Sequence, residues 1–357
     1  MERVYLDHNA TTPLRPEART AMLQAMDLIG NPASVHMEGR SAKSMLEKAR
    51  VQVADLVGCA PAEVVFTSGA TEAARVLASL PEGHSVFVAP TAHDALLVHA
   101  GCNGPQQPDA GHTFAMGLAN SETGVISPLP VKEDGKWCFG SQRANWLLLD
   151  ITQSVGRVSF DFAAFGADFA VLSAHKLGGP KGVGALIVRQ GLEITALAEG
   201  GGQEMGRRSG TENIIGICGF GAACAAAKRD IADGQWAEVE KLRKILENAL
   251  AAETKTTIFV GKGETRLPNT LCFATPGWKG EAQVIQMDLA GFAISAGSAC
   301  SSGKLRASTV LTAMGFDEAT ASCAIRVSLG LETTQEQVLR FADTWLAKEA
   351  KFRARAA

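Results

Sequence analysis

Lys176 is a candidate for covalent chemistry because of the residues on either side of it. It follows the run Val-Leu-Ser-Ala-His and precedes Leu-Gly-Gly-Pro-Lys-Gly-Val-Gly, so a buried strand is expected to deliver its amine into a glycine-rich bend. A lysine that forms a Schiff base with an aldehyde needs such a desolvated position. The alternative is a surface lysine at the end of a strand.

Asp150 and Gln153 are expected at the same edge of a sheet as Lys176. Asp150 ends the run Trp-Leu-Leu-Leu, and Gln153 follows three residues later. Ligands of open α/β sheets bind at the carboxyl ends of the strands. An aspartate there can keep a pyridinium nitrogen protonated, which makes the ring an electron acceptor. The alternative role for Asp150 is a helix N-cap.

The segment Ser68-Gly69-Ala70-Thr71-Glu72 is expected where a strand turns into a helix. The free N–H groups of the first helical turn and the hydroxyl of Thr71 would there stabilise a phosphate. The alternative is a strand-to-helix turn that binds nothing.

Two isolated residues stand out by type and position. His93 follows the apolar run that starts at Val86 and is expected to stack on a ring or to move protons, with a solvated loop histidine as the alternative. Arg326 lies in the apolar run Ala-Ile-Arg-Val-Ser-Leu-Gly, where a buried guanidinium needs an anionic partner. That partner is either a substrate carboxylate or an internal salt bridge.

The elements that position these residues alternate along the first two thirds of the chain, which favours a parallel α/β architecture. Apolar residues over 45–56 follow helical spacing, which predicts a helix that ends at Gly58. The apolar stretch 214–227 predicts a buried helix. Short apolar runs predict strands at 64–67, 86–89, 146–149, 169–173 and 185–188.

From about Gln235 a long amphipathic helix, further strands and more helices predict a smaller α+β domain. We therefore predict an α/β protein with a mostly parallel sheet flanked by helices in a large domain of residues 14–232. Residues 1–13 and 233–357 are expected to form the small domain.

Composition limits the class of protein. The chain has 357 residues, 46% hydrophobic and 20% charged, with a net charge of −3, so direct binding of nucleic acid is not expected. Its start lacks a basic region followed by an apolar one, and its most apolar stretch is shorter than the roughly 20 residues that span a bilayer. We expect a cytoplasmic protein with no membrane partner.

Cysteine usage singles out one residue. The eight cysteines include no C-x-x-C pair, so neither a metal site nor a disulfide framework is expected, and most should be small core residues. Cys300 differs because it lies in Ala-Gly-Ser-Ala-Cys-Ser-Ser-Gly, a run suited to a mobile loop.

Several segments, in this order, resemble the cysteine desulfurases of the class V aminotransferase group, which are fold type I pyridoxal-phosphate enzymes. The resemblance runs nearly from end to end and is carried by Leu-Asp-His-Asn-Ala-Thr-Thr-Pro at 6–13, Gly-Asn-Pro-Ala-Ser at 30–34, Thr-Ser-Gly-Ala-Thr-Glu at 67–72, Asp-Ile-Thr-Gln-Ser-Val-Gly at 150–156, Ser-Ala-His-Lys at 173–176, Gly-Gly-Gly-Gln-Glu at 200–204, Arg-Ser-Gly-Thr-Glu-Asn at 208–213 and Gly-Ser-Ala-Cys at 297–300.

The resemblance implies roles for individual residues. For pyridoxal 5'-phosphate it implies Lys176 as the Schiff-base lysine, Asp150 on the ring nitrogen, Gln153 near the ring hydroxyl, His93 over the ring, and Ala70, Thr71, Ser173 and His175 around the phosphate. Thr211 corresponds to a residue that reaches the phosphate of a neighbouring subunit, which implies a homodimer. Asn31 and Arg326 would bind the substrate carboxylate, and Cys300 would be the nucleophile that accepts sulfur.

The activity that the resemblance implies is conversion of L-cysteine to L-alanine. Lys176 would remove the Cα proton, and Cys300 would take the sulfur as a persulfide for an acceptor protein, either an iron–sulfur scaffold or a tRNA-thiolation protein. Two departures from the family pattern stand out. Ser121 replaces the second of two asparagines, which lies beside the cofactor in relatives, and the span from His93 to Asn120 is short, with a bare loop expected over 101–111.

Other functions share parts of this pattern. A plain class V aminotransferase would use the same pocket but would not need Cys300, whereas a selenocysteine lyase would also use a cysteine. A catalytically silent subunit that binds a sulfur-transfer partner would not need Lys176, Asp150 and Cys300 together. A dinucleotide-binding domain is disfavoured because no G-x-G-x-x-G follows an early strand.

Overall fold

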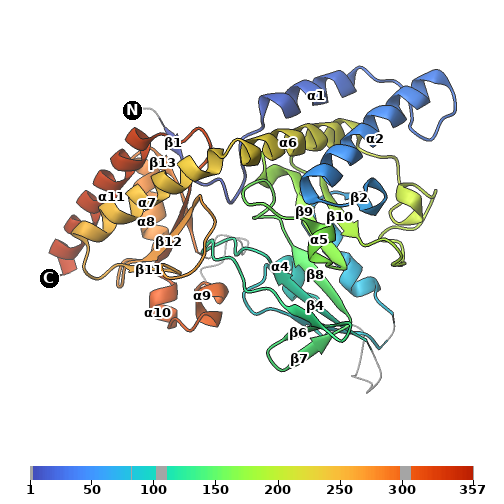
Figure 1. Cartoon of the computed structure of the whole chain (residues 1–357). Helices are drawn as coiled ribbons and strands as arrows, with labels where there is room; N and C mark the ends of the chain where they lie inside the picture. The colour runs from blue at the N-terminus through green and yellow to red at the C-terminus, as the bar shows by residue number, and fades with distance from the viewer. Residues whose placement is uncertain (1–2, 82, 102–110, 298–306, 357) are drawn as a thin grey trace. The chain divides into compact units, whose positions relative to one another are not determined.

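The computed structural model describes residues 3–81, 83–101, 111–297 and 307–356. They fold into two units, each with its own sheets and hydrophobic core (Figure 1). The larger unit consists of Thr12–Leu118 and Ser127–Ala232. The smaller unit consists of Met1–Thr11, Ala119–Ile126 and Asp233–Ala357.

The segment Ala119–Ile126 departs from the predicted domain boundaries, which included it in the large domain. It belongs to the smaller unit because its backbone is bound there. The N–H of Leu267 donates to the carbonyl of Gly124 at 2.7 Å, and Val125 forms an isolated β-bridge with Arg266.

The larger unit is built on a six-stranded sheet, which confirms the prediction of an α/β fold with a mostly parallel sheet. In spatial order the strands are β2 (Val64–Thr67), β10 (Gly184–Val188), β9 (Phe169–Ser173), β8 (Trp146–Asp150), β4 (His112–Gly117) and β3 (Ser85–Val88). Of the six strands, β10 alone runs opposite to the other five, because a short bend after β9 returns the chain directly alongside it.

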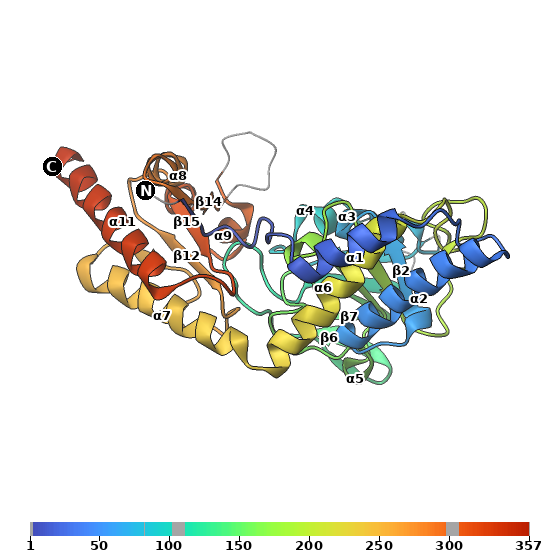
Figure 2. The ribbon, with the colours of Figure 1, turned by 90° about the horizontal axis from the view of Figure 1, so that it is seen from above.

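Helices cover this sheet. In the larger unit, α6 lies alongside both α1 and α2 (Figures 1 and 2). Glycine permits this close packing, because a Cβ at Gly221 would lie 2.6 Å from the Cα of Ala49. Within the described part of the chain, no helix combines the length and apolar character needed to cross a membrane. The helices of this unit are α1 (Pro16–Met26), α2 (Met37–Val57), η1 (Pro61–Glu63), α3 (Ala70–Ala73), η2 (Ala74–Ser79), α4 (Asp94–Leu97), α5 (Phe162–Phe165), η3 (Ala174–Lys176), η4 (Glu204–Gly206) and α6 (Ile214–Ala232).

The larger unit also contains a three-stranded antiparallel sheet that no sequence pattern predicted. It consists of β5 (Val131–Glu133), β6 (Lys136–Phe139) and β7 (Gln142–Ala144). Asp134 and Gly135 join the first two strands with φ values of 49° and 75°, which is the backbone of a tight hairpin turn. The buried indole of Trp137 ties this sheet to the main one by donating to Asp168 at 2.8 Å.

The smaller unit has an α+β architecture. Its four-stranded antiparallel sheet has the order β11 (Ile258–Phe259), β12 (Thr270–Ala274), β15 (Ala324–Ser328) and β14 (Ser295–Ala296). A parallel pair, β1 (Val4–Tyr5) and β13 (Phe292–Ala293), brings in the N-terminal segment. The helices are α7 (Gln235–Glu253), α8 (Gly280–Leu289), α9 (Thr309–Ala313), α10 (Glu318–Ala321) and α11 (Gln335–Ala356).

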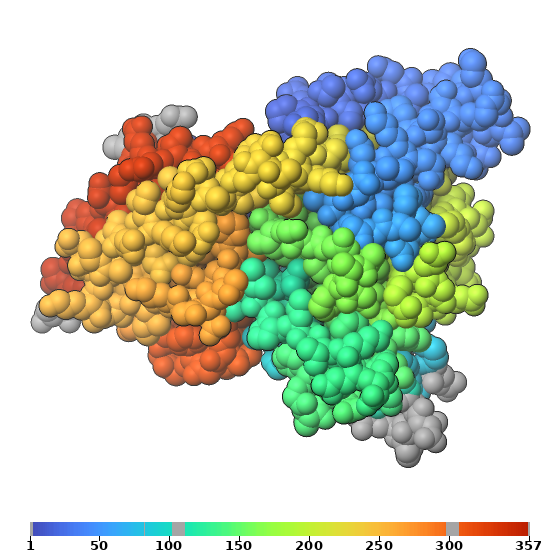
Figure 3. Space-filling view, in the orientation of Figure 1, coloured from blue at the N-terminus to red at the C-terminus, as the bar shows by residue number. Residues whose placement is uncertain are grey.

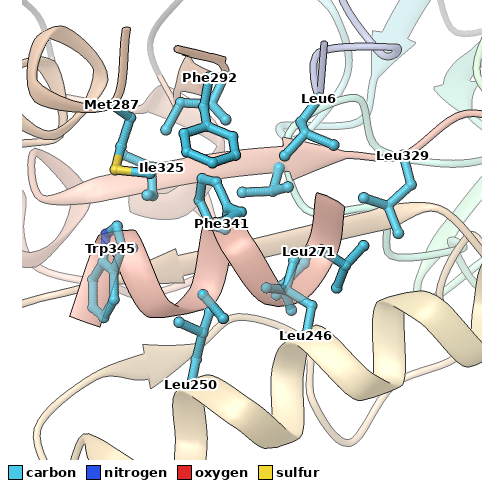
Figure 4. Packing of buried hydrophobic residues seen from close by; sticks show 14 of the residues in the cluster. Leu6, Leu246, Leu250, Leu271, Met287, Phe292, Ile325, Leu329, Phe341 and Trp345 are labelled. Atoms are coloured by element: carbon cyan, nitrogen blue, oxygen red, sulfur yellow. The ribbon is translucent and has the colours of Figure 1, made fainter. Parts of the chain in front are cut away.

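Apolar side chains from the helices and the sheet form the core of the smaller unit (Figure 4). Leu246 and Leu250 of α7 and Phe341 and Trp345 of α11 are completely buried in it. The spacing of four residues within each pair places both side chains on one helix face, as the predicted amphipathic helix requires.

Candidate active site

The strand register of the larger unit gathers several of its predicted site residues at one edge of the sheet. Gly184 pairs with Thr67 on one side and with Ser173 on the other, and Asp150 pairs with both Gly117 and Val171. The segments after the carboxyl ends of β2, β3, β8 and β9 therefore share this edge. They carry residues 68–72, His93, Asp150 with Gln153, and Ser173 to Lys176.

The backbone around Lys176 is fixed from two sides. Its carbonyl oxygen accepts from Thr12 Oγ1 at 3.0 Å and from Arg157 Nη2 at 3.1 Å. The N–H of Thr12 also donates to the carbonyl of His175 at 2.9 Å. The side chain of Lys176 is half-buried. Its amine is therefore carried by a backbone that these hydrogen bonds hold in place. Thr12 and Arg157 were not singled out from the sequence, although Thr12 lies within one of the motifs and Arg157 directly follows another.

Asp150 is not a helix N-cap, because the residues that follow it form turns. Its Oδ1 accepts from the N–H of Thr152 at 2.9 Å, which orients the half-buried carboxylate at the end of β8. The amide oxygen of buried Gln153 accepts from Arg157 Nη1 at 2.7 Å. Arg157 therefore links the segment after β8 to the carbonyl of Lys176.

The loop from Ser68 to Thr71 lies next to Ser173. A Cβ at Gly184 would lie 2.6 Å from the Cα of Gly69, so only glycine at this position lets the loop approach the sheet so closely. A Cβ at Gly69 would lie 3.7 Å from Ser173 Oγ. Backbone N–H groups at the start of α3, exposed Thr71 and the hydroxyl of Ser173 thus surround a place suited to an anion.

The two predicted site histidines have different environments. Burial, together with the nearby Lys176 and Lys181 cations, lowers the pKa of His175 to about 4, so its ring is neutral at pH 7. His93 is exposed and forms the N-cap of α4, where its Nδ1 accepts from the N–H of Ala95 at 3.0 Å. A neutral His93 therefore carries its proton on Nε2.

An ion pair connects the Ser68–Glu72 loop to the segment that carries Thr211. Arg208 donates from Nε to Glu72 at 2.9 Å, and the other oxygen of Glu72 accepts from the N–H of Ser68 at 2.7 Å. Burial acts to raise the pKa of Glu72, but these hydrogen bonds and the Arg208 charge lower it overall. Thr211 itself is exposed just before α6.

Asn31 lies in the turn between α1 and α2, where its exposed side chain has a local role. Its Oδ1 accepts from the N–H of Ala33 at 2.9 Å, and its carbonyl accepts from the N–H of Ser34.

Arg326 and Ser121 come together in the smaller unit. Arg326 is 3% exposed and donates from Nη1 to the carbonyl of Ser121 at 3.0 Å. Its Nη2 donates to Asp7 at 2.7 Å, so the internal salt bridge considered from the sequence is present. Its Nε is buried without a hydrogen-bond partner among the described residues.

The cysteines of the described residues are free, and four of them are buried as expected: Cys218, Cys224, Cys272 and Cys323. Cys300, the predicted nucleophile, lies outside the described residues.

Comparison with known proteins places these residues in a family. The sequence profile of the family described as aminotransferase class-V matches residues 4–101 and 111–341. A cysteine desulfurase of Enterobacter agglomerans is 36% identical over 368 aligned positions, which cover 95% of this chain and 90% of that protein. The cysteine desulfurase IscS of Dictyoglomus turgidum is 33% identical and covers 94% of this chain and 91% of its own.

Solved structures show the same likeness. A NifS-like protein superposes with a TM-score of 0.85 at 29% identity, covering 98% of this chain and 99% of its own. A NifS-like protein from Rickettsia africae gives a TM-score of 0.82 at 28% identity, covering 96% and 98%. The family resemblance inferred from the sequence is thereby confirmed, and the chain belongs to the class-V aminotransferase family and, within it, to the cysteine desulfurases.

Proposed function

We propose that this protein is a pyridoxal-phosphate-dependent cysteine desulfurase that converts L-cysteine to L-alanine and takes the sulfur onto Cys300. The observation that carries the proposal is the placement of Lys176. It follows β9 on a backbone held by Thr12 and Arg157, at the sheet edge where the neighbouring strand β8 ends in Asp150.

The residues at this edge fit the cofactor. Pyridoxal phosphate has an aldehyde, a ring nitrogen and a phosphate, and the edge offers an amine, a carboxylate and a set of anion-binding groups. The close approach of Gly184 to Gly69 keeps the phosphate segment beside Ser173, where Ala70, Thr71 and His175 would complete the cradle. Gln153 and His93 would contact the ring.

When bound, pyridoxal phosphate supplies an electron-accepting ring attached to the amino group of the substrate. Lys176 would remove the Cα proton and hold it on Nζ. The hydrogen bonds to its backbone keep the amine in the same position from one turnover to the next. Asp150 would keep negative charge beside the ring nitrogen. His93, with its proton on Nε2, would donate rather than accept at that atom.

The substrate carboxylate would bind to Arg326 and Asn31, and Cys300 would attack the sulfur of cysteine. In the balanced reaction the Cβ–S bond of L-cysteine breaks and an S–S bond forms on Cys300, so one thiol becomes a persulfide. The electron pair of the broken bond stays on carbon, which is protonated to give L-alanine. No external oxidant or reductant is needed.

We also expect a homodimer. Large apolar side chains are exposed on α1, on α2 and on the turn between them, which lies at the surface of the larger unit (Figure 3). Ile29 and Val35 in this turn are 89% and 87% exposed. Such apolar side chains gather where another chain covers them, and a neighbouring chain would also give exposed Thr211 its expected partner phosphate. The persulfide would then pass to an acceptor protein, either an iron–sulfur scaffold or a tRNA-thiolation protein.

Borohydride reduction followed by peptide mass spectrometry tests the proposal. The purified protein should absorb visible light, and reduction should fix the cofactor to the peptide that contains Lys176. The Lys176→Ala variant should lose this adduct and the formation of alanine from cysteine. Lys181→Ala, which removes a nearby lysine, should keep both. A colourless wild-type protein that takes up no pyridoxal phosphate would refute the assignment.

A further inference from the structure

Glu122 is a buried carboxylate of the smaller unit that the proposed reaction does not use. It is 6% exposed, and its Oε2 accepts from the hydroxyl of Ser308 at 2.5 Å. Ser308, only 1% exposed, is also the N-cap of α9, where its Oγ accepts from the N–H of Leu311 at 3.0 Å. The Ser308 hydroxyl therefore accepts a hydrogen bond from the helix backbone and donates one to the carboxylate of Glu122.

The same oxygen of Glu122 lies beside a second segment. A Cβ at Gly297 would lie 3.3 Å from Glu122 Oε2 and 3.5 Å from the Cβ of Ser308. Gly297 and Ser308 are eleven positions apart in the sequence and flank the stretch that contains Cys300. The two ends of this stretch therefore meet at one buried carboxylate.

Glu122 is itself held by its neighbours. The side-chain oxygen of Asn120 accepts from the N–H groups of Glu122 and Thr123, both at 2.9 Å. The adjacent carbonyl of Ser121 accepts from Arg326 at 3.0 Å. A short rigid segment thus connects the arginine expected to bind the substrate carboxylate to both ends of the Cys300 stretch.

We propose that Glu122 is a positioning residue that, through Ser308, fixes the ends of the Cys300 segment relative to Arg326. The inference rests on the proposed function, because it concerns the delivery of the Cys300 sulfur. A hydrogen bond to a buried carboxylate is stronger than one between neutral groups, so the link suits an anchor. Its loss would leave binding of cysteine intact and slow the transfer of sulfur.

A matched pair of helix-cap variants separates this role from simple support of a helix. Ser308→Ala removes an N-cap and the link to Glu122. Asp317→Ala removes the N-cap of α10, where Asp317 accepts from Thr320 at 2.8 Å, and leaves Glu122 untouched. Both should lower the melting temperature, because each loses a capping acceptor.

Only Ser308→Ala should alter the chemistry. Its kcat for alanine formation should fall about tenfold or more, while binding of cysteine, followed through cofactor absorbance, stays near the wild-type value. Alkylation of Cys300 by iodoacetamide, measured on the peptide by mass spectrometry, should be at least about threefold faster, because the ends of its segment are released. In the Glu122→Ala background, Ser308→Ala should add little to this increase.

The two proposals fail in different ways. A wild-type protein that forms no alanine would refute the proposed function. The rates of Cys300 alkylation in the wild type, Ser308→Ala and Asp317→Ala would still test the anchoring role of Glu122. Equal alkylation and equal kcat in Ser308→Ala and Asp317→Ala would overturn the anchoring role. Additive effects of Glu122→Ala and Ser308→Ala on alkylation would overturn it as well.

Discussion

The guanidinium of Arg326 donates from Nη2 to Oδ1 of Asp7 at 2.7 Å, and the other carboxylate oxygen of Asp7 accepts from the hydroxyl of Ser295 at 2.8 Å. Asp7 is thereby held on both oxygens, and it orients an arginine that is 3% exposed. Because Nη1 is bound to Ser121 and Nε has no partner among the described residues, the guanidinium has a defined orientation and an unused donor.

Arg326→Lys should therefore weaken substrate binding while the positive charge remains. A lysine cannot keep the contacts with both Asp7 and Ser121 and also present the further, correctly oriented donor that Nε of the arginine offers to a carboxylate. We expect KM for L-cysteine to rise about tenfold or more, with a smaller change in kcat. Steady-state kinetics on the cofactor-loaded variant measure both. An unchanged KM for L-cysteine would contradict a role of Arg326 in substrate binding.

Asp150→Asn should remove the negative charge of Asp150 while keeping its structural hydrogen bond. The asparagine oxygen can still accept from Thr152, so the turn after β8 should be retained. Without the negative charge, however, the ring nitrogen of the cofactor would lose its partner, and kcat should fall about a hundredfold. The variant should still form the borohydride-fixed adduct at Lys176. Retention of wild-type kcat would show that Asp150 does not tune the cofactor.

The sequence predicted best those elements that are buried on both faces. The runs at 64–67 and 169–173 became β2 and β9 with the predicted bounds, because continuous apolar residues in short segments fit interior strands. The sharing of one sheet edge by Asp150 and Lys176 followed from this, since parallel neighbouring strands end on the same side.

Features that depend on contacts between distant residues were missed. Thr12 and Arg157 meet at the carbonyl of Lys176 although both lie far from it in the sequence, and no local pattern indicates such a meeting. The sheet at 131–144 is a different case. Its Asp134-Gly135 turn is a strong hairpin signal, but the strand before the turn is short, exposed and mostly polar, so the apolar residues after the turn have no matching run before it.

Acid should destabilise the protein through His175. Histidine in the unfolded chain titrates near 6.5, whereas burial and neighbouring lysines lower the folded pKa to about 4. Between these values the unfolded chain binds more protons than the folded one, so stability falls as the pH drops from about 6.5 to about 4. Relative to His175→Gln, the wild type should lose on the order of 1 kcal/mol over this window, since partial exposure reduces the effect.

Urea unfolding of the cofactor-free protein across this pH range measures the difference. A gap between wild type and His175→Gln that does not change with pH would contradict the depressed pKa.

Two carboxylates that pair with the same arginine allow a final comparison. Arg50 donates to both oxygens of Glu204 at 2.8 Å and to Glu47 at 3.2 Å. The side chain of Glu204 is 2% exposed and that of Glu47 is 48% exposed. Burial alone would lower the pKa of Arg50, but the hydrogen bond and charge of Glu204, followed by the charge of Glu47, raise it above the ordinary value.

Glu204→Ala should lower the free energy of unfolding by about 3 kcal/mol, because it leaves a buried guanidinium with only the more exposed carboxylate of Glu47 as a charge partner. It also removes the acceptor of the Phe66 N–H, which lies 2.8 Å from the carboxylate. Glu47→Ala, the matched control on the same arginine, should cost less than about 1 kcal/mol, as exposed pairs do.

Urea denaturation of the two variants provides the measurement. Glu204 has a φ of 50°, an unfavourable backbone conformation that its bonds to Arg50 and Phe66 help to maintain. Glu204→Ala should therefore also expose the Gly200–Gly210 segment to faster hydrogen exchange, whereas Glu47→Ala should not. Equal losses of stability in the two variants would mean that burial does not make the Arg50–Glu204 pair stronger than the Arg50–Glu47 pair.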